Sequence, residues 1–209
     1  VRDALGAGGA VSGDEGGDES GAPSRSGREA HVSARLANVY EAFEDRFRGA
    51  RADIKQRQTI YLDPIRAAGA GTPERPVLDI GCGRGEWLEL LAEQGLTGRG
   101  VDVNDRAVAI CREHGVDAGA RDMFAALAEA GEGALGAVTA FHVIEHLDME
   151  TLVDFLDAAR TALAPGGALI YETFAQGNEA FGKPSNPAFL LAPGELLDAV
   201  RERLRVLAY

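Results

Sequence analysis

Glycines and acids that could form a ligand site cluster in the stretch Val-Leu-Asp-Ile-Gly-Cys-Gly-Arg-Gly-Glu, which begins at Val77. The glycines stand at alternate positions, Gly81, Gly83 and Gly85. Glycine adopts positive φ and has no Cβ, so such a turn lets a ligand approach the backbone closely. Asp79, just before the glycines, could attract a positively charged group. The stretch therefore predicts a ligand site in which a carboxylate lies beside accessible backbone.

A strand and a helix must position this turn. Val77, Leu78 and Ile80 are typical of a buried parallel strand, and from Glu86 onward apolar residues recur at helical spacing. The predicted unit is strand, turn and helix. Open α/β sheets bind their ligands at the carboxyl ends of the strands, which is where this turn lies.

A dinucleotide site is one interpretation of the turn, and Glu86 argues against it. The dinucleotide pattern Gly-x-Gly-x-x-Gly needs a third glycine where this chain has Glu86. A carboxylate in the first helical turn would repel a pyrophosphate bound there. The pattern favours a ligand that carries an ammonium group and no phosphate, and it disfavours an NAD-linked dehydrogenase.

The stretch Val77–Gly85 resembles the first motif of class I S-adenosylmethionine-dependent methyltransferases. The resemblance covers roughly residues 74–173. It implies an α/β fold with a Rossmann-like doubly wound sheet of strand order 3-2-1-4-5, and S-adenosyl-L-methionine as the cofactor. Around the first motif it implies these cofactor-binding residues: Asp79, Gly81, Cys82, Gly83, Glu86 and Trp87.

A second strand is expected from Gly100 to Asp102. Asp102 lies about 20 residues after the glycines, where an acidic side chain can accept hydrogen bonds from both ribose hydroxyls. The resemblance adds Val103 to the cofactor contacts. Asn104 or Asp105 is expected to cap the next helix.

Asp122 and Met123 follow a weak third strand, expected at 116–120. In the family, residues at this place flank the adenine: an acid accepts from the exocyclic amine and an apolar neighbour stacks on the ring. The resemblance therefore assigns both residues to the cofactor. A helix N-cap is the alternative role for Asp122.

The fourth strand is expected at 137–143, after a glycine-rich loop at 131–136, and it runs into Phe-His-Val-Ile-Glu-His. This segment resembles that of small-molecule members of the superfamily, including the ubiquinone-type O-methyltransferases. The resemblance implies that Phe141 and His142 lie beneath the sulfonium. His142 is the candidate catalytic residue, as a general base, but we favour a role in lining the pocket, because methyl transfer to a soft nucleophile needs no proton removal. Glu145 and His146 have metal-ligand spacing with His142, but no further ligand is evident and we expect no metal.

The N-terminal part divides into two regions. Residues 1–28 hold few large apolar side chains and are expected to form a disordered tail. Residues 29–70 are expected to form a helical arm, with one helix ending at Gly49 and another over 52–68 that Pro64 kinks or restarts.

The arm resembles the one that precedes the core in some bacterial sugar- or lipopolysaccharide-linked methyltransferases. Because arms of this kind often cover the cofactor, Arg48, Arg51 and Arg57 are candidates to reach the methionine carboxylate, with Arg57 preferred. A solvated basic face is the alternative.

Beyond the fourth strand we expect a helix over 150–163, a turn at 165–167 and a fifth strand over 168–172. A long polar loop then follows, and long loops in compact domains tend to be functional. Its candidate substrate contacts are Asn178, Phe181 and Asn186.

A helix from Pro193 to Leu204 and the start of a sixth strand at 205–209 complete the chain. The fold normally closes with a sixth and a seventh strand as an antiparallel hairpin. We therefore expect the C-terminal hairpin to be incomplete.

Length and composition bound the function. The 209 residues suggest one domain, at 71–209, plus the arm and the tail, and the net charge of −12 argues against a nucleic-acid surface. Cys82 and Cys111 do not suggest a disulfide framework. No apolar run approaches the roughly 20 residues of a membrane span, and no signal peptide is evident, so we expect a cytoplasmic protein that does not bind membranes.

The expected function is transfer of a methyl group from S-adenosylmethionine to an oxygen, sulfur or metalloid nucleophile of a small molecule. The protein's main task would be to hold donor and acceptor in line. One alternative is a non-catalytic S-adenosylmethionine-binding module. Another is a methyltransferase that acts on a glycan, a lipopolysaccharide or another macromolecule. The sequence indicates neither the acceptor nor the oligomeric state.

Overall fold

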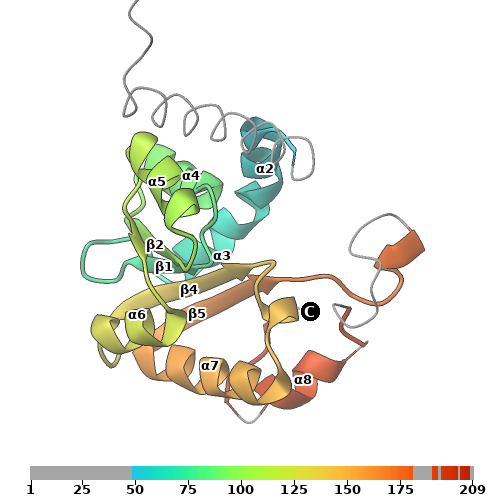
Figure 1. The fold of residues 1–209 in the computed structure, drawn as a ribbon. Coiled ribbons are helices and arrows are strands. Elements are labelled where there is room, and N and C mark those ends of the chain that lie inside the picture. Colours follow the sequence, from blue (N-terminus) through green and yellow to red (C-terminus); the bar gives the residue numbers. More distant parts are fainter. Residues whose placement is uncertain (1–48, 181–189, 193, 202, 208–209) are drawn as a thin grey trace, which may run out of the picture. The chain divides into compact units, whose positions relative to one another are not determined.

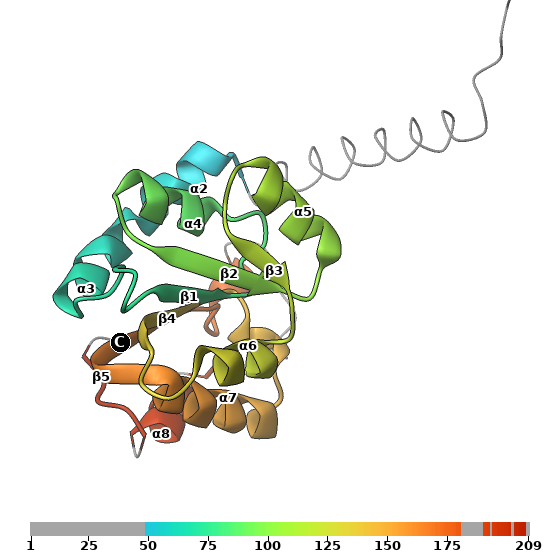
Figure 2. The same ribbon diagram turned by 90° about the vertical axis from the view of Figure 1, so that its left-hand side faces the viewer.

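The computed structural model describes residues 49–180, 190–192, 194–201 and 203–207. The predicted tail, the first predicted helix, Arg48, Phe181 and Asn186 lie outside these residues. Within them, helices cover both faces of a five-stranded sheet whose paired strands are all parallel (Figures 1 and 2). The predicted α/β architecture is confirmed.

The strands follow the order β3-β2-β1-β4-β5, which confirms the predicted order 3-2-1-4-5. The chain order reverses between β1 and β4, where Asp79 pairs in register with Thr139. Ligands of open α/β sheets bind outside the strand ends at such a reversal. The strand bounds are β1 Val77–Ile80, β2 Gly98–Asp102, β3 Ala118–Ala120, β4 Leu135–Phe141 and β5 Leu163–Glu172.

Side chains alternate between the two faces of the strands and build two cores. Val77 and Ala137 pack with α3 (Leu62–Ala67), α4 (Glu86–Glu93) and α5 (Asp105–Glu113). Leu78 and Val138 face the opposite core, formed with α6 (Met123–Ala130), α7 (Met149–Ala162) and α8 (Glu195–Val200). The two cores fix the strand ends that carry the acidic residues.

The helical arm differs in detail from the single helix expected over 52–68. It consists of α2 (Arg51–Gln58), a 3₁₀ turn η1 (Thr59–Tyr61) and α3. Pro64 lies in the first turn of α3, where its missing N–H costs no intrahelical hydrogen bond. Of the two predicted effects of Pro64, the restart is therefore correct.

The fourth strand lies two residues earlier than predicted, at 135–141 instead of 137–143. It therefore begins inside the predicted loop at 131–136. It ends at Phe141 because His142 has a φ of +57°, which interrupts extended backbone. A 3₁₀ turn, η2 (Ile144–His146), follows.

The fifth strand begins at Leu163, not at Ala168 as predicted. The expected turn at 165–167 is an irregularity inside the strand: Leu135 pairs with Leu163, whereas Ala137 pairs with Ala168. Gly166, with a φ of +76°, allows the extra residues to bulge out without ending the pairing.

The C-terminal elements are shorter than predicted. The helix expected over 193–204 is α8, which spans six residues, and a 3₁₀ turn η3 (Asn178–Ala180) lies in the preceding loop. The described residues 205–207 form no strand, so the predicted start of a sixth strand is wrong for them. Leu207 is 79% exposed and lacks the packing that would hold a strand at the sheet edge.

Candidate functional site

The glycine turn after β1 is fixed by packing as well as by backbone conformation. Gly81 has a φ of +65°, and a Cβ there would lie 2.5 Å from Cγ2 of Val143. Gly85, with a φ of +81°, is the N-cap of α4, and a Cβ there would lie 2.9 Å from Sγ of Cys111. Both contacts are closer than real Cβ atoms tolerate. The turn therefore requires glycine at both positions.

Asp102, the last residue of β2, ties this turn to the neighbouring strand. Its Oδ2 accepts a hydrogen bond from the N–H of Gly83 at 2.9 Å, and its Oδ1 accepts one from the N–H of Asn104 at 2.8 Å. A carboxylate has about four lone-pair sites. Each oxygen of Asp102 therefore keeps capacity for a further donor, such as a ribose hydroxyl.

Asp79 is a buried carboxyl, only 2% exposed, in the middle of the sheet. Its Oδ1 accepts a hydrogen bond from the Thr139 hydroxyl at 2.7 Å. Burial, together with the charges of Asp102 and Glu86, raises the pKa of Asp79 to about 7. No basic side chain in the described part of the chain pairs with Asp79, although burial of an uncompensated carboxylate is costly.

This donor and acceptor set fits S-adenosylmethionine. The acids at the ends of β1 and β2 suit the ammonium and the ribose hydroxyls of the cofactor, and they do not suit a phosphate. The buried Nε1–H of Trp87 also has no acceptor among the described residues. A ligand carboxylate or carbonyl could satisfy it.

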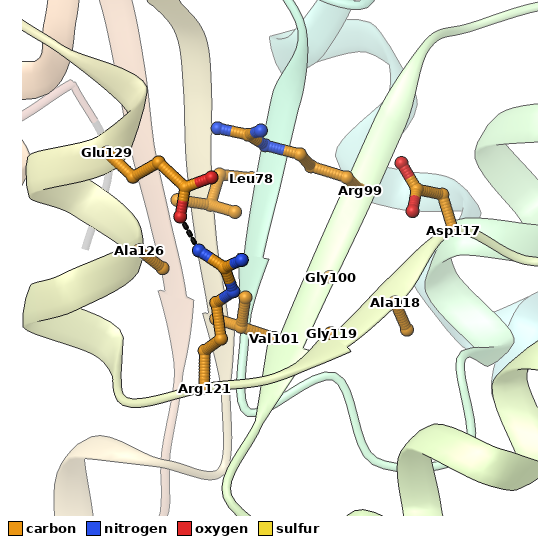
Figure 3. A pocket seen from close by; sticks show the side chains of 10 residues that line it. All are labelled: Leu78, Arg99, Gly100, Val101, Asp117, Ala118, Gly119, Arg121, Ala126 and Glu129. Carbon is orange, nitrogen blue, oxygen red and sulfur yellow. Dashed lines mark ion pairs between the residues drawn. The ribbon is translucent and has the colours of Figure 1, made fainter.

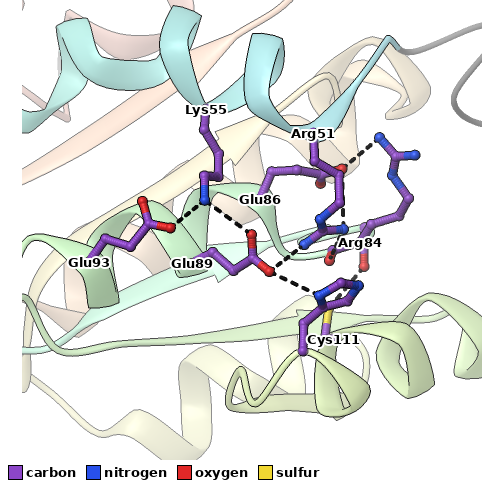
Figure 4. A network of polar contacts seen from close by, with 9 residues as sticks. Arg51, Lys55, Arg84, Glu86, Glu89, Glu93 and Cys111 are labelled. Atoms are coloured by element: carbon purple, nitrogen blue, oxygen red, sulfur yellow. Dashed lines mark hydrogen bonds and ion pairs between the residues drawn. The ribbon is translucent and has the colours of Figure 1, made fainter.

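Glu86 is already engaged by arginines. Its Oε1 lies 2.6 Å from Nη2 of Arg84 and 3.5 Å from Nη1 of Arg51. Arg51 also pairs with Glu89 at 2.9 Å and donates a hydrogen bond to the carbonyl of Arg84 at 3.1 Å. Figure 4 shows these side chains meeting between α2 and α4. Glu86 and Arg51 therefore hold the arm against the glycine turn.

Three aromatic rings line the next part of the sheet edge. Tyr61 of η1 contacts Phe141, with ring centroids 5.0 Å apart, and Trp87 meets Phe141 edge-on at 5.6 Å. The Tyr61 hydroxyl donates a short hydrogen bond to Oε2 of Glu172, the last residue of β5. The cluster gives the ends of β4 and β5 an apolar lining with one carboxylate.

His142 lies between two carboxylates at this edge. Its Nδ1 is 3.6 Å from Oε1 of Glu145, and its Nε2 is 3.4 Å from Oε1 of Glu172. The ring stacks on Phe174 with centroids 4.5 Å apart. The carboxylates of Glu145 and then of Glu172 raise the pKa of His142 to about 9, so the imidazole is protonated at neutral pH. Thr173 donates to Glu145 at 2.8 Å and helps fix this arrangement.

The sequence of this site and of the domain around it matches a known protein family. A sequence model described as "Methyltransferase domain" matches residues 54–200, which is more than half of the chain. The chain belongs to this methyltransferase domain family. Together with the parallel sheet of order 3-2-1-4-5, the match identifies a class I S-adenosylmethionine-dependent methyltransferase, and the family uses S-adenosylmethionine.

Curated relatives of this methyltransferase include proteins named ubiquinone biosynthesis O-methyltransferase. That of Cupriavidus pinatubonensis is 30% identical over 130 residues, covering 57% of this chain and 51% of the relative. That of Xanthomonas axonopodis is 27% identical over 165 residues, covering 72% of this chain and 68% of the relative. The chain spans about half the length of the first three of these relatives.

Solved structures resemble this methyltransferase as well. A SAM-dependent methyltransferase from Archaeoglobus fulgidus matches with a TM-score of 0.66 and 29% identity, over 78% of this chain and 72% of that one. Magnesium protoporphyrin IX methyltransferase from Synechocystis PCC 6803, solved with bound SAM, matches with a TM-score of 0.54 over 74% of this chain and 70% of that one. At 19% identity the second match supports the fold alone.

The other predicted site residues of the methyltransferase lie at the same sheet edge. Asp122 caps α6, and its Oδ1 accepts from the N–H groups of Phe124 at 2.9 Å and Ala125 at 3.2 Å. Met123 packs partly buried against the core, whereas Val103 is 80% exposed. The capping role of Asp122 is therefore present, and its role toward adenine stays a prediction.

The predicted carboxylate-binding arginines differ in their surroundings. Arg51 is committed to the ion pairs with Glu86 and Glu89. Arg57 is exposed and donates to the carbonyl of Asp53 at 3.4 Å, and its charge contributes to lowering the pKa of Glu172. Arg57 therefore lies near the β5 end of the site. Asn178 begins η3 in the loop beyond β5.

Tyr61, Thr139 and Glu172 are site residues that the sequence reasoning did not single out. Glu172 was predicted only as the end of a strand. Its position beside the end of β4 follows from the strand order 4-5, so the sheet prediction already contained a signal for it. Tyr61 lies 111 residues away from Glu172, and no local pattern links the two.

A cavity of about 170 Å³ lies elsewhere on the methyltransferase, between the sheet and α6 (Figure 3). Arg99 and Arg121 point into it, and Arg121 forms an ion pair with Glu129. Its walls use the middle of β2, β3 and Arg121, and its lining includes neither Asp79 nor Asp102. It borders the segment that leads to Asp122.

The described residues contain neither a membrane-spanning helix nor a cluster of metal ligands. No helix among them combines the length and the apolar character that crossing a bilayer would need. No group of three or more His, Cys, Asp or Glu side chains among them is arranged to hold a metal ion.

Proposed function

We propose that the protein transfers the methyl group of S-adenosylmethionine to a hydroxyl oxygen of a small molecule, bound above the ends of β4 and β5. The observation that carries the proposal is His142, held between Glu145 and Glu172 directly after Phe141. The relatives named as O-methyltransferases support an oxygen acceptor. The proposal also places the protein in the cytoplasm.

The cofactor would be held by the acids and the glycine turn. Asp102 would accept from the ribose hydroxyls, Asp79 would face the ammonium, and Asp122 with Met123 would flank the adenine. Arg57 is the candidate partner for the methionine carboxylate. When bound, the cofactor supplies an activated methyl group on a sulfonium, and its transfer leaves a neutral thioether.

His142 is the preferred acceptor for the hydroxyl proton. Moving a proton from a phenol of pKa about 10 to an imidazole of pKa about 9 costs about 1.4 kcal/mol. Glu172, whose pKa is lowered from 4.5, would require more than about 7 kcal/mol. The carboxylates thus make His142 a stronger base and also keep it protonated at neutral pH. Its nitrogen Nε2, which faces the half-exposed Glu172, is the one that an acceptor could reach.

The aromatic side chains favour an apolar or aromatic acceptor. Phe174 stacks on the His142 ring, and the Tyr61 hydroxyl donates to Glu172. Phe141 contacts the Tyr61 ring. A flat ring could contact these aromatic surfaces while presenting its hydroxyl to the imidazole. An aromatic lining does not favour the binding of a highly charged acceptor.

The test is a pH profile of S-adenosylhomocysteine formation with a panel of phenols, catechols and thiols. With a phenol, kcat/KM should rise up to about pH 9, and His142→Ala should lower kcat by roughly 10²- to 10⁴-fold. Glu172→Gln should move the rise toward the ordinary histidine pKa of about 6.5.

Other outcomes separate the alternatives. Turnover of thiols alone, independent of His142, would favour a soft nucleophile that needs no proton removal. Tight cofactor binding without turnover of any small molecule would favour a binding module or a macromolecular acceptor.

A further inference from the structure

A buried hydrogen bond joins β1 and β4 where the strand order reverses. The Thr139 hydroxyl donates to Oδ1 of Asp79 at 2.7 Å, and the two residues pair in register across the two strands. Thr139 is 0% exposed and Asp79 is 2% exposed, so water does not compete for this contact. The bond therefore belongs to the interior of the sheet, next to the strand ends that carry the predicted cofactor contacts.

The side chain of Thr139 is suited to holding a carboxylate in one orientation. Threonine is β-branched, so its χ1 is restricted and its hydroxyl has few alternative directions. A valine would fill almost the same space in a buried strand, so what threonine adds here is the hydrogen-bond donor. Among the described residues no donor contacts Oδ2 of Asp79, and this second oxygen is therefore available to a ligand.

The surroundings of Asp79 otherwise oppose its negative charge. Four titratable groups interact with Asp79, and none of them is a cation: Asp102, Glu86, Cys82 and Cys111. Burial and the two acids raise the pKa of Asp79 to about 7. Among the described residues, the Thr139 hydroxyl is the group that lowers this pKa. Without the hydroxyl, the carboxyl would take up a proton more readily.

We propose that Thr139 is a positioning residue for cofactor binding, which orients the Asp79 carboxylate and keeps it ionised toward the ammonium of S-adenosylmethionine. The inference rests on the proposed function, in which Asp79 faces that ammonium. It deepens the proposed function by giving a role to a side chain that acts through Asp79. A carboxylate that is already oriented loses less freedom when the ligand binds, and this favours affinity.

Two ligands separate this role from simple support of the sheet. S-adenosylhomocysteine carries the ammonium and the carboxylate of the cofactor. 5′-Methylthioadenosine keeps the adenine, the ribose and the thioether, and it lacks both of these charged groups. A change that acts through Asp79 should therefore affect the first ligand and spare the second, whereas a distorted sheet should affect both.

The experiment measures the binding of both ligands by calorimetry to the full chain, as the wild type, Thr139→Val and Thr139→Ser. Thr139→Val should weaken the binding of S-adenosylhomocysteine roughly tenfold at pH 7, because the ammonium loses an oriented and ionised partner. The binding of 5′-methylthioadenosine should change little. Thr139→Ser keeps the hydroxyl and should restore most of the affinity for S-adenosylhomocysteine.

The pH dependence of binding gives a second readout. In the wild type, the affinity for S-adenosylhomocysteine should rise as the pH rises through about 7, because the ionised form of Asp79 is the one that attracts the ammonium. In Thr139→Val the midpoint of this rise should move to higher pH, because a bond that stabilises the ionised form is lost. 5′-Methylthioadenosine should show no such rise with either protein.

The role of Thr139 is overturned if Thr139→Val binds S-adenosylhomocysteine like the wild type, or if both ligands weaken equally. It is also overturned if Thr139→Ser binds no better than Thr139→Val. Failure of the wild type to bind S-adenosylhomocysteine would count against the proposed function instead. Carboxyl titration of Asp79 by nuclear magnetic resonance without ligand would then still decide the inference: its pKa should rise in Thr139→Val, and an unchanged titration would contradict the role of Thr139.

Discussion

The carboxylate of Asp102 accepts a hydrogen bond from the backbone N–H of Gly83 at 2.9 Å, which joins the end of β2 to the glycine turn after β1. The two motifs that the sequence offered separately thus form one unit. A change in either residue should move the other.

Asp79→Asn should stabilise the protein at pH 8 and change its stability little near pH 4. Burial raises the pKa of Asp79 from 3.8 to about 7, so the folded protein carries a costly buried charge above that pH. Below about pH 4 the carboxyl is protonated in both the folded and the unfolded chain. Asparagine removes the charge and can still accept from Thr139.

The gain in the free energy of unfolding should be on the order of 1–3 kcal/mol at pH 8. Urea unfolding at both pH values measures it, with the exposed Asp105→Asn as the control. Binding of S-adenosylhomocysteine should weaken in the Asp79 variant. A loss of stability at pH 8 would show that another group compensates the ionised carboxylate.

The imidazole of His142 should titrate near pH 9, and both Glu145→Gln and Glu172→Gln should lower its pKa. Nuclear magnetic resonance of the labelled ring measures this directly, and Glu150→Gln, on the exposed side of α7, serves as the control. The folded pKa lies above the unfolded value of 6.5. The stabilisation is therefore full below about pH 6.5 and is lost as the pH rises through about 9. A titration at 6.5 in the wild type would contradict the ion pairs.

Glu89→Gln should loosen α2. Glu89 lies 2.9 Å from Arg51, 3.4 Å from Lys55 and 3.2 Å from His114, so one side chain holds three neighbours. The free energy of unfolding should fall by about 1–2 kcal/mol, because these ion pairs are only partly exposed. Hydrogen exchange of residues 51–58 should accelerate.

Glu93→Gln is the matched control, because among the described residues Glu93 pairs with Lys55 alone, and its side chain is 55% exposed. It should change exchange in α2 much less. Equal effects of the two variants would mean that the network adds nothing beyond single surface pairs.

Tyr61→Phe should raise the pKa of Glu172, because the Tyr61 hydroxyl is one of the groups that lower it. The phenyl ring would keep its contact with Phe141, so the fold should change little. Carboxyl titration by nuclear magnetic resonance measures the shift. An unchanged Glu172 titration would show that the short hydrogen bond is absent in solution.

The cofactor half of the site was predictable because its signals are local. Asp79, the glycines and Asp102 lie at strand ends that the apolar runs already define, and the strand order then brings them together. Asn104 as a helix cap followed from the same local chemistry, and its Oδ1 does accept from the backbone N–H of Arg106 at 3.0 Å.

The acceptor half was predicted only in part, because its contacts join distant segments. Tyr61 and Glu172 meet across the sheet edge, and the packing of α5 brings Cys111 to the carbonyl of Gly83. The positive φ of His142 was also hidden, since it depends on the turn that follows β4. The spacing of apolar residues predicts which face of a strand or helix a side chain lies on. It does not predict which distant side chain it contacts.

Calorimetry with S-adenosylhomocysteine, on the wild type, Asp102→Ala and the control Asp105→Ala, measures whether Asp102 at the end of β2 holds the cofactor. The wild type should bind with a micromolar or tighter Kd, about −8 kcal/mol or better. Asp102→Ala should weaken binding by about 1–3 kcal/mol, because the ribose hydroxyls and the Gly83 N–H lose a charged acceptor. Asp105→Ala should bind like the wild type. Binding of NADH but not of S-adenosylhomocysteine, or equal binding by both aspartate variants, would contradict an S-adenosylmethionine site at Asp102.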